Sequence, residues 1–220
     1  MMPASIESTK AIAVAVSGGA DSIALLHKLK DQHNGSLTAL TVDHGLRPES
    51  RQEAETVAGW MTQLGIPHHI LTWTDEKPKS GIQEQAREAR YTLMTDWCKA
   101  HDIDILALAH HADDQAETFI HRLCRGSGLD GLAAMAPSSY IKGIKIIRPL
   151  LSTPKEELIS CLRQKGVSWI EDPSNQKEDY TRVRIRKILR ELKPEGLTTD
   201  RILKLTERLR SNRDVMDQWV

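Results

Sequence analysis

Cysteine, phenylalanine and long apolar runs are scarce in this chain of 220 residues. Its three cysteines, Cys98, Cys124 and Cys161, are odd in number and widely spaced, which disfavours a disulfide framework and indicates reduced thiols. No apolar run approaches the roughly 20 residues that a membrane-spanning helix needs, so we expect no membrane association. The leader MMPASIESTK has neither an apolar core nor a cleavage pattern. We therefore expect no secretory signal and a cytoplasmic protein.

A net charge of either sign is also missing, because 30 Lys and Arg residues balance 30 Asp and Glu residues. The distribution is nevertheless uneven, since residues 181–213 contain eleven basic and four acidic residues, a net charge of +7. Such asymmetry is typical of a segment that faces a polyanion, and solvated helix faces are the alternative. The length and the hydrophobic content of 40% suit one α/β domain with a small appendage.

Short aliphatic runs alternate with helical patterns along the first half of the chain. The expected strands are residues 11–16, 37–42, 68–71 and 105–109, and the expected helices are residues 21–32, 49–63 and 82–100. Right-handed crossovers between such units predict a Rossmann-like α/β fold with a doubly wound parallel sheet. Ligands of these sheets bind beyond the carboxyl ends of the strands, where the polar motifs of this chain lie.

The pattern changes after residue 137. A β-hairpin is expected around Lys142 and Gly143, and a helix is expected to start with Thr153 as its cap and Pro154 in its first turn. A C-terminal helical extension is expected to begin at Thr199 or Asp200 and to run toward Val220. Its predicted apolar stripe comprises Ile202, Leu205, Leu209 and Met216.

The hexamer SGGADS, residues 17–22, follows the first expected strand. Its two glycines let backbone N–H groups approach an anion, and the N-terminus of the next helix points at the same place. Ser17 and Ser22 add hydroxyl donors, while Asp21 would repel a phosphate unless a cation lay between them. The hexamer therefore predicts a phosphate cradle with Mg²⁺ bound by Asp21, and a tight strand-to-helix turn is the alternative. Because no lysine precedes Ser22, the G-x-x-x-x-G-K-[ST] loop is excluded.

The stretch HHADDQAET follows the fourth expected strand and is expected to start a helix. Asp114 and Glu117 are three residues apart, so they share one helical face, and two carboxylates suit an amine ligand. A metal site is the first alternative, with His110, His111, Asp113 and Glu117 as ligands. A capped, solvated helix start is the second.

The stretch TVDHGLRPES ends the second expected strand. Asp43 and His44 stand where a nucleoside lies in a doubly wound sheet, so we expect them beside adenosine. Arg47 has the charge to meet a phosphate. Ser50 and Glu53 have the spacing of a capping box.

Arg87 and Arg90 share one face of the expected helix over residues 82–100. Guanidinium groups suit bidentate contacts with phosphate. Ion pairs on the helix surface with Glu84 or Glu88 are the alternative.

Taken together, these motifs carry a resemblance to a known family. SGGADS resembles the pyrophosphate loop of the N-type ATP pyrophosphatases, which cleave ATP between its α and β phosphates. The further motifs are similar to those of the tRNA(Ile)-lysidine synthetase family over about residues 11–190. They are TVDHGLRPES (41–50), the RxxRY of Arg87, Arg90 and Tyr91, HHADDQAET (110–118), RGSGLDGLAAM (125–135), RPLL (148–151) and EDPSN (171–175).

The resemblance implies an adenine nucleotide α-hydrolase-like fold and an ATP-dependent ligase. Family members join free L-lysine to the wobble cytidine of the isoleucine tRNA with a CAU anticodon, after ATP has adenylated the cytosine. The implied cofactors are ATP and Mg²⁺, the implied partners are this tRNA and lysine, and a homodimer is compatible with the sequence. Residues 1–190 would form the catalytic domain. Residues 191–220 would form a helical linker or the start of a tRNA-binding region.

The resemblance also assigns roles to individual residues. ATP is expected at Ser17, Gly18, Gly19, Ala20, Asp21, Ser22, Asp43 and His44. Lysine is expected at Asp114 and Glu117, tRNA at Arg182, Arg184 and Arg186, and the catalytic set is Asp21, Asp114, Glu117 and Arg90. Val183 departs from the family, which often has asparagine there, and an apolar side chain makes no such hydrogen bond.

Two other functions fit parts of the sequence. A related enzyme that installs sulfur in tRNA would need paired cysteines, and the nearest pair, Cys98 and Cys124, is far apart along the chain. A non-catalytic ATP-binding module would bind ATP without releasing pyrophosphate. The intact Asp21 and the acidic helix start disfavour such a module.

Overall fold

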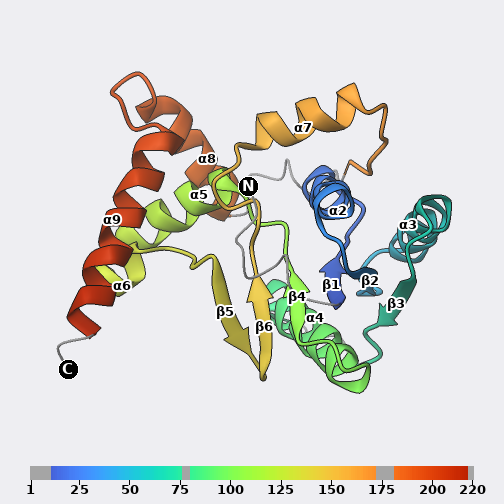
Figure 1. Cartoon of the computed structure of the whole chain (residues 1–220). Helices are drawn as coiled ribbons and strands as arrows, with labels where there is room; N and C mark the ends of the chain where they lie inside the picture. Colours follow the sequence, from blue (N-terminus) through green and yellow to red (C-terminus); the bar gives the residue numbers. More distant parts are fainter. Residues whose placement is uncertain (1–10, 76–79, 172–180, 218–220) are drawn as a thin grey trace.

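The computed structural model describes residues 11–75, 80–171 and 181–217 (Figure 1). A six-stranded sheet with the strand order β3-β2-β1-β4-β6-β5 forms its centre. The strands are β1 (Ala11–Ala15), β2 (Ser36–Asp43), β3 (His68–Thr72), β4 (Ile105–Ala107), β5 (Ser138–Ile141) and β6 (Ile144–Ile147). All neighbouring pairs are parallel except β5 and β6. The predicted α/β fold with a doubly wound sheet is confirmed, with one antiparallel strand at its edge.

Helices cover both faces of the sheet. They are α2 (Ala20–Gln32), α3 (Ser50–Leu64), α4 (Ile82–Ala100), α5 (Ala112–Leu123), α6 (Leu129–Leu132), α7 (Lys155–Gln164), α8 (Thr181–Leu192) and α9 (Thr199–Asp217). Ile12 and Val14 of β1 pack with α2, α3 and α7, whereas Ala13 packs with α4. Successive strand residues point to opposite faces, so this short apolar strand is buried from both sides.

The strand order reverses between β1 and β4. From β1 the chain builds outward through β2 to β3, and it then returns to place β4 on the other side of β1. In doubly wound sheets this reversal opens a crevice at the carboxyl ends of the two strands. SGGADS follows β1 and HHADDQAET follows β4, so the reversal places these two motifs on either side of one crevice.

The hairpin prediction is confirmed, but two predicted helix caps are wrong. Lys142 and Gly143 connect β5 and β6 with φ angles of +49° and +85°, as a tight two-residue hairpin turn requires. Helix α7 begins at Lys155 and its N-cap is Pro154, because the backbone at Thr153 is still in the preceding turn. The Ser50–Glu53 capping box does not form, since the Glu53 carboxylate instead binds Arg47 at 2.9 Å.

Helices α5, α8 and α9 pack on one another through a third apolar cluster, at one end of the sheet (Figure 1). The stripe predicted for α9 is only half right. Ile202 is 1% exposed, but Leu205 and Met216 are 43% and 58% exposed. Thr206 is buried in place of Leu205, because residues four apart share one face of a helix and Thr206 lies four residues after the buried Ile202. The Thr206 hydroxyl donates to the Leu203 carbonyl at 2.8 Å.

Within the described ranges, no helix is both long enough and apolar enough to span a membrane.

The packing of α9 gives a first test. Ile202→Ala should lower the free energy of unfolding by about 2–5 kcal/mol, because it leaves a cavity between α9 and α5. Leu205→Ala should change it by less than about 0.5 kcal/mol, since that side chain is largely exposed. Urea denaturation of both variants measures the two effects, and equal losses would contradict this orientation of the helix.

Candidate functional site

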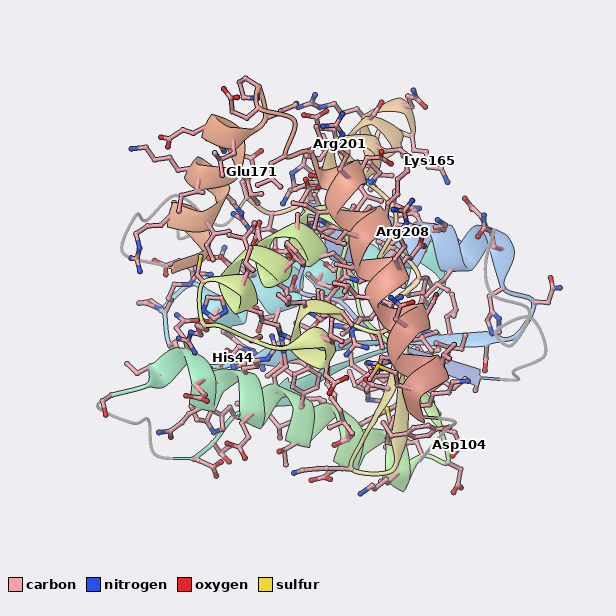
Figure 2. All side chains as sticks on the ribbon, turned by 90° about the vertical axis from the view of Figure 1, so that its left-hand side faces the viewer. His44, Asp104, Lys165, Glu171, Arg201 and Arg208 are labelled. Carbon is pink, nitrogen blue, oxygen red and sulfur yellow. The ribbon has the colours of Figure 1, made fainter. Side chains whose placement is uncertain are left out.

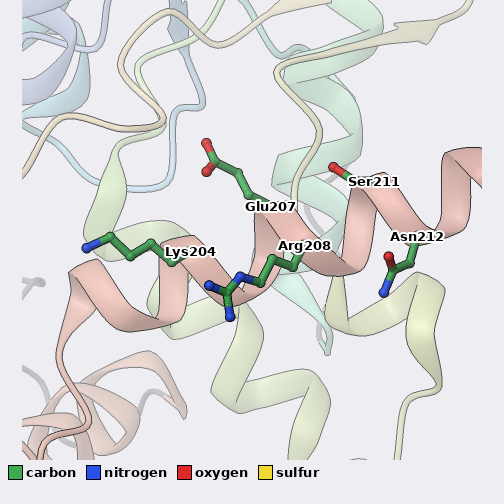
Figure 3. Close-up of a pocket in the computed structure, with 5 residues that line it drawn as sticks. All are labelled: Lys204, Glu207, Arg208, Ser211 and Asn212. Atoms are coloured by element: carbon green, nitrogen blue, oxygen red, sulfur yellow. The ribbon is translucent and has the colours of Figure 1, made fainter.

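The site lies where β1 and β4 end and where α2, α5 and α7 begin. Figure 2 labels one residue at each edge of the sheet, and the two lie on opposite sides of the view. His44 follows β2 and marks the carboxyl ends of the strands, whereas Asp104 precedes β4 and marks their amino ends. An open hollow of about 500 Å³ lies elsewhere, on α9, lined by Lys204, Glu207, Arg208, Ser211 and Asn212 (Figure 3). No predicted site residue lines that hollow, so we place the candidate site at the crevice instead.

The glycine loop is held in shape by the protein itself. Gly18 has a φ angle of +87°, and a Cβ atom there would lie 2.8 Å from Ile170 Cδ1 and 2.9 Å from Val57 Cγ2. Only glycine fits this place without strain. The Gly18 carbonyl accepts a hydrogen bond from Ile170 N at 2.9 Å.

The two serines close the loop from inside. Ser22 Oγ donates to the Gly19 carbonyl at 2.9 Å and accepts from Ser17 N at 3.2 Å. Gly19 is the N-cap of α2, and its carbonyl accepts from Ser22 N and Ile23 N at 3.1 Å. The N–H groups of Ala20 and Asp21 therefore have no acceptor within the helix. N–H groups at a helix start suit an anion, so this geometry is compatible with the predicted phosphate cradle.

Two cationic side chains from other parts of the chain contact the Asp21 carboxylate. Its Oδ2 lies 3.2 Å from Lys155 Nζ and 3.5 Å from His111 Nε2. Burial opposes ionisation of this carboxyl, but the contacts with His111 and Lys155 outweigh it and lower the pKa of Asp21. The other oxygen, Oδ1, is buried and has no hydrogen-bond partner. A carboxylate oxygen in this state is a donor of the type that Mg²⁺ binds.

Lys155 is the residue of this group that the sequence analysis missed. Its only signal is its place directly after Thr153 and Pro154, at a helix start. The partner carboxylate lies 134 residues away along the chain, so no local pattern reveals the pair.

His111 is a buried cation at the centre of the site. Its Nε2 lies 3.5 Å from Asp21 and from Asp114, and its Nδ1 lies 3.5 Å from Asp113. Burial disfavours the charged ring, but the contacts with Asp113 and Asp21 and the charge of Asp114 outweigh this effect and raise the pKa of His111 to about 9. The imidazolium has no lone pair left for a metal. Across the part of the chain that the structure describes, no group of three or more His, Cys, Asp or Glu side chains is arranged to hold a metal, so the predicted alternative site does not form.

Asp113 connects the starts of three helices. Its Oδ2 accepts a hydrogen bond from the Lys155 backbone N–H at 2.9 Å, and its Oδ1 lies 3.5 Å from Thr199 Oγ1. The contact with His111 and the bond from Lys155 lower the pKa of Asp113 to about 2. Asp113 therefore ties α5 to the first residues of α7 and α9.

The predicted acidic pair of α5 is buried. Asp114 is 9% exposed and Glu117 is 3% exposed. Asp114 Oδ2 accepts from the His111 backbone N–H at 3.1 Å, which helps to cap the helix. Glu117 Oε1 accepts from Arg186 Nε at 2.5 Å. A buried carboxylate of this kind needs a cationic partner, and Arg186 provides it here.

The arginines of the basic segment, residues 181–213, differ in their contacts. Residues 181–192 form helix α8. On this helix Arg184 is exposed, and Arg186 forms an ion pair with Glu117. Arg210 Nη2 donates to the Met135 carbonyl at 2.9 Å and so fastens α9. The side chain of Arg182 and most of the EDPSN motif, from residue 172, lie outside the described residues.

Asp43 and His44 follow β2, which is the neighbour of β1 in the sheet. Asp43 is 7% exposed, and its Oδ1 accepts from the Gly45 N–H at 2.9 Å. The His44 ring meets the ring of Trp73 edge-on, with 6.2 Å between the centroids. Both residues therefore lie at the carboxyl edge of the sheet, as predicted.

Arg87 and Arg90 lie against an aromatic ring of their own helix. Their guanidinium carbons are 5.2 and 5.5 Å from the centroid of Tyr91. Arg87 Nη2 also lies 3.3 Å from the Tyr91 hydroxyl. Arg87 thus contacts Tyr91 rather than Glu84 or Glu88.

Comparison with known families decides what kind of site this is. The PP-loop domain matches residues 2–192. The chain belongs to the PP-loop domain family. The hexamer from Ser17 to Ser22, called the PP-loop below, and the crevice described above both lie within the matched range.

Three relatives share much of the PP-loop chain, and each is a tRNA(Ile)-lysidine synthase. That of Ruegeria pomeroyi is 43% identical over 218 residues, which are 98% of this chain and 52% of the relative. That of Wolbachia pipientis wMel is 46% identical over 87% of this chain and 46% of its own length. That of Methylobacterium nodulans is 43% identical over 91% and 60%. The chain thus spans about half the length of the curated relatives it matches.

Solved structures support the PP-loop fold. The U34-tRNA thiolase NcsA from Methanococcus maripaludis superposes with a TM-score of 0.80 at 20% identity, over 94% of this chain and 75% of that one. NMN synthetase from Francisella tularensis does so with a TM-score of 0.54 at 14% identity, over 91% and 85%. At such identities the likeness shows the fold alone.

The charge state of His111 gives a pH test. Its pKa is about 9 in the folded chain against an ordinary value of 6.5, so the ring stabilises the fold fully below pH 6.5 and loses this effect as the pH rises toward 9. The free energy of unfolding of the wild type should therefore fall across this window relative to that of His111→Gln. Urea denaturation at both ends of the window measures the difference, and a constant difference would contradict a charged His111.

Proposed function

We propose that the chain is the catalytic part of a lysidine-forming ligase. It would join free L-lysine to the wobble cytidine of the CAU-anticodon isoleucine tRNA, through an adenylated cytidine, with release of AMP and pyrophosphate. One observation carries this proposal: a single buried imidazolium, His111, contacts both Asp21 of the PP-loop and Asp114 of the acidic pair. An ATP site and an amine site would then adjoin each other. The sequence identity of 43% with a tRNA(Ile)-lysidine synthase supports the same reaction.

ATP fits the PP-loop end of the crevice. The amides at the start of α2 and the two PP-loop glycines suit the phosphates, and Asp43 and His44 lie on the side where adenosine would bind. The buried, unpartnered Oδ1 of Asp21 fits Mg²⁺, which would neutralise phosphate charge as pyrophosphate leaves. Lys155 stands beside the same carboxylate and would add a further positive charge.

Lysine fits the acidic pair on α5. Asp114 and Glu117 are buried, and a buried carboxylate binds a cation strongly because water does not compete. Arg186 now occupies one oxygen of Glu117, so an incoming ammonium group would have to share or replace that contact. We place Arg90 at the reaction centre on the strength of its match to the family motif.

Transfer RNA fits the basic helices. Arg184 on α8 is exposed and would contact the phosphate backbone, and Arg182 and Arg186 belong to the same helix. Phosphate contacts of this kind supply affinity that falls with salt.

Sulfur transfer is less well supported. Cys98 is buried, and burial raises the pKa of its thiol to about 12, whereas nucleophilic cysteines have lowered pKa values. Cys124 and Cys161 are exposed, one after α5 and one on α7.

The deciding experiment mixes the chain with Mg-ATP, labelled lysine and a CAU-anticodon isoleucine tRNA transcript. We expect label on the tRNA that resists mild alkali, which strips aminoacyl esters, together with AMP and pyrophosphate. Asp21→Asn should abolish all three products, because the carboxylate that would hold Mg²⁺ is gone. AMP and pyrophosphate without label would identify a different acceptor, and bound ATP without any product would favour a non-catalytic module.

Glu117→Gln separates the lysine site from the ATP site. The amide keeps the shape but loses the charge that would hold an ammonium group. We expect the KM for lysine to rise at least about tenfold, as for one charge-assisted hydrogen bond, while the KM for ATP stays within about twofold. Initial rates at varied lysine and varied ATP measure the two constants. Equal rises in both would return Glu117 to a purely structural role with Arg186.

A further inference from the structure

Two histidines and a tryptophan lie together at the amino ends of the strands, away from the crevice. His69 is on β3, and His101 follows α4, three residues before Asp104, which marks this edge in Figure 2. The His101 ring stacks on that of Trp97, with 3.9 Å between the centroids and 14° between the planes. The His69 centroid lies 4.9 Å from that of Trp97 and 5.9 Å from that of His101. His69 and His101 are called the histidine pair below.

The hydrogen bond of His101 decides which of its ring nitrogens can bind a ligand. Nδ1 lies 2.8 Å from the Trp97 carbonyl. A carbonyl oxygen only accepts, so Nδ1 carries the proton and donates it, and Nε2 keeps a lone pair. Histidines that bind metals usually donate their other ring N–H to a carbonyl or a carboxylate in this way, which fixes the tautomer and the orientation of the ring. His101 therefore has the hydrogen bonding of a metal ligand.

The position of the histidine pair also favours a cation. His101 is the C-cap of α4, and its backbone N–H donates to the Cys98 carbonyl at 3.2 Å. The last carbonyls of a helix carry a partial negative charge, which attracts a positive ion. Both imidazoles are exposed, so an ion reaches them directly from solvent. Trp97 beneath them is half-buried and packs on the core between α4 and the sheet, so the pair rests on a fixed support.

The spacing of the two rings fits one shared ion. Imidazole nitrogens bind transition-metal ions at about 2 Å, which puts each ring centroid about 3.2 Å from the ion. Two rings on one ion then have centroids about 5–6.5 Å apart, and the observed 5.9 Å falls in that range. The adjacent His68 is not part of the pair, because its Nε2 lies 2.8 Å from Thr41 Oγ1. In the described parts of the chain no third His, Cys, Asp or Glu completes the group, so water would fill the other positions.

We propose that the histidine pair binds a divalent transition-metal ion of the class that prefers imidazole, such as Zn²⁺, Ni²⁺ or Cu²⁺. Neutral imidazole suits these ions, whereas Mg²⁺ and Ca²⁺ prefer oxygen ligands. Two protein ligands hold an ion less tightly than the three or four of a catalytic or structural zinc site. The site shares no residue with the crevice, so it does not depend on the proposed function.

The test titrates Ni²⁺ into the whole 220-residue chain and follows both the heat of binding and the tryptophan fluorescence. Ni²⁺ quenches an indole beside which it binds, so Trp97 reports on the site. His69→Gln and His101→Gln should each weaken Ni²⁺ binding at least about tenfold, because each variant removes one of two ligands. The control His27→Gln, which changes a half-buried histidine on α2, should bind Ni²⁺ as the wild type does.

A further variant separates binding from its optical signal. Trp97→Phe keeps both ligands, so it should still bind Ni²⁺ but lose the quenching that Ni²⁺ causes in the wild type. Quenching that persists in Trp97→Phe would contradict a site beside this indole. Ni²⁺ binding that is unchanged in both variants of the histidine pair would overturn the proposal and point to other ligands, such as the exposed thiols of Cys124 and Cys161. A wild type that binds no Ni²⁺ would overturn it as well.

Discussion

The buried ion cluster around His111 is the interaction on which the site depends. One imidazolium holds Asp21, Asp113 and Asp114 together, and these carboxylates come from the start of α2 and the start of α5. Three carboxylates this close would repel one another without the central cation. Lys155 adds a second cation, and its backbone N–H binds Asp113, so α7 joins the same cluster. The reversal of strand order between β1 and β4 is what brings these elements together.

Much of this arrangement follows from local sequence. The apolar runs and the glycines after them predict the sheet, and the hexamer SGGADS predicts a loop that presents amides to an anion. The acidic residues Asp114 and Glu117 are predicted on one face of a helix and are found there, buried. The sheet and the shared helical face are confirmed because each rests on neighbours along the chain, through strand periodicity or helix spacing.

The partners of these groups could not be predicted. Lys155 meets Asp21 across 134 residues, and Arg186 meets Glu117 across 69. Nothing in a local pattern chooses between Glu117 as a ligand for a substrate amine and Glu117 as the partner of an arginine. The alternative metal site included His111, and only its three carboxylate neighbours make it a cation instead. The burial of Thr206 in place of Leu205 likewise depends on how α9 packs on α5.

The hydrogen bond between Ile170 N and the Gly18 carbonyl bears on the rate at which a nucleotide would bind. Because the Gly18 carbonyl is bound by Ile170 and the serines close the loop from inside, the PP-loop has its shape before any nucleotide arrives. Binding would then need no slow folding of the loop around its ligand. The association rate would be set by diffusion and by the approach of a charged molecule, and it would depend on ionic strength rather than on loop motion.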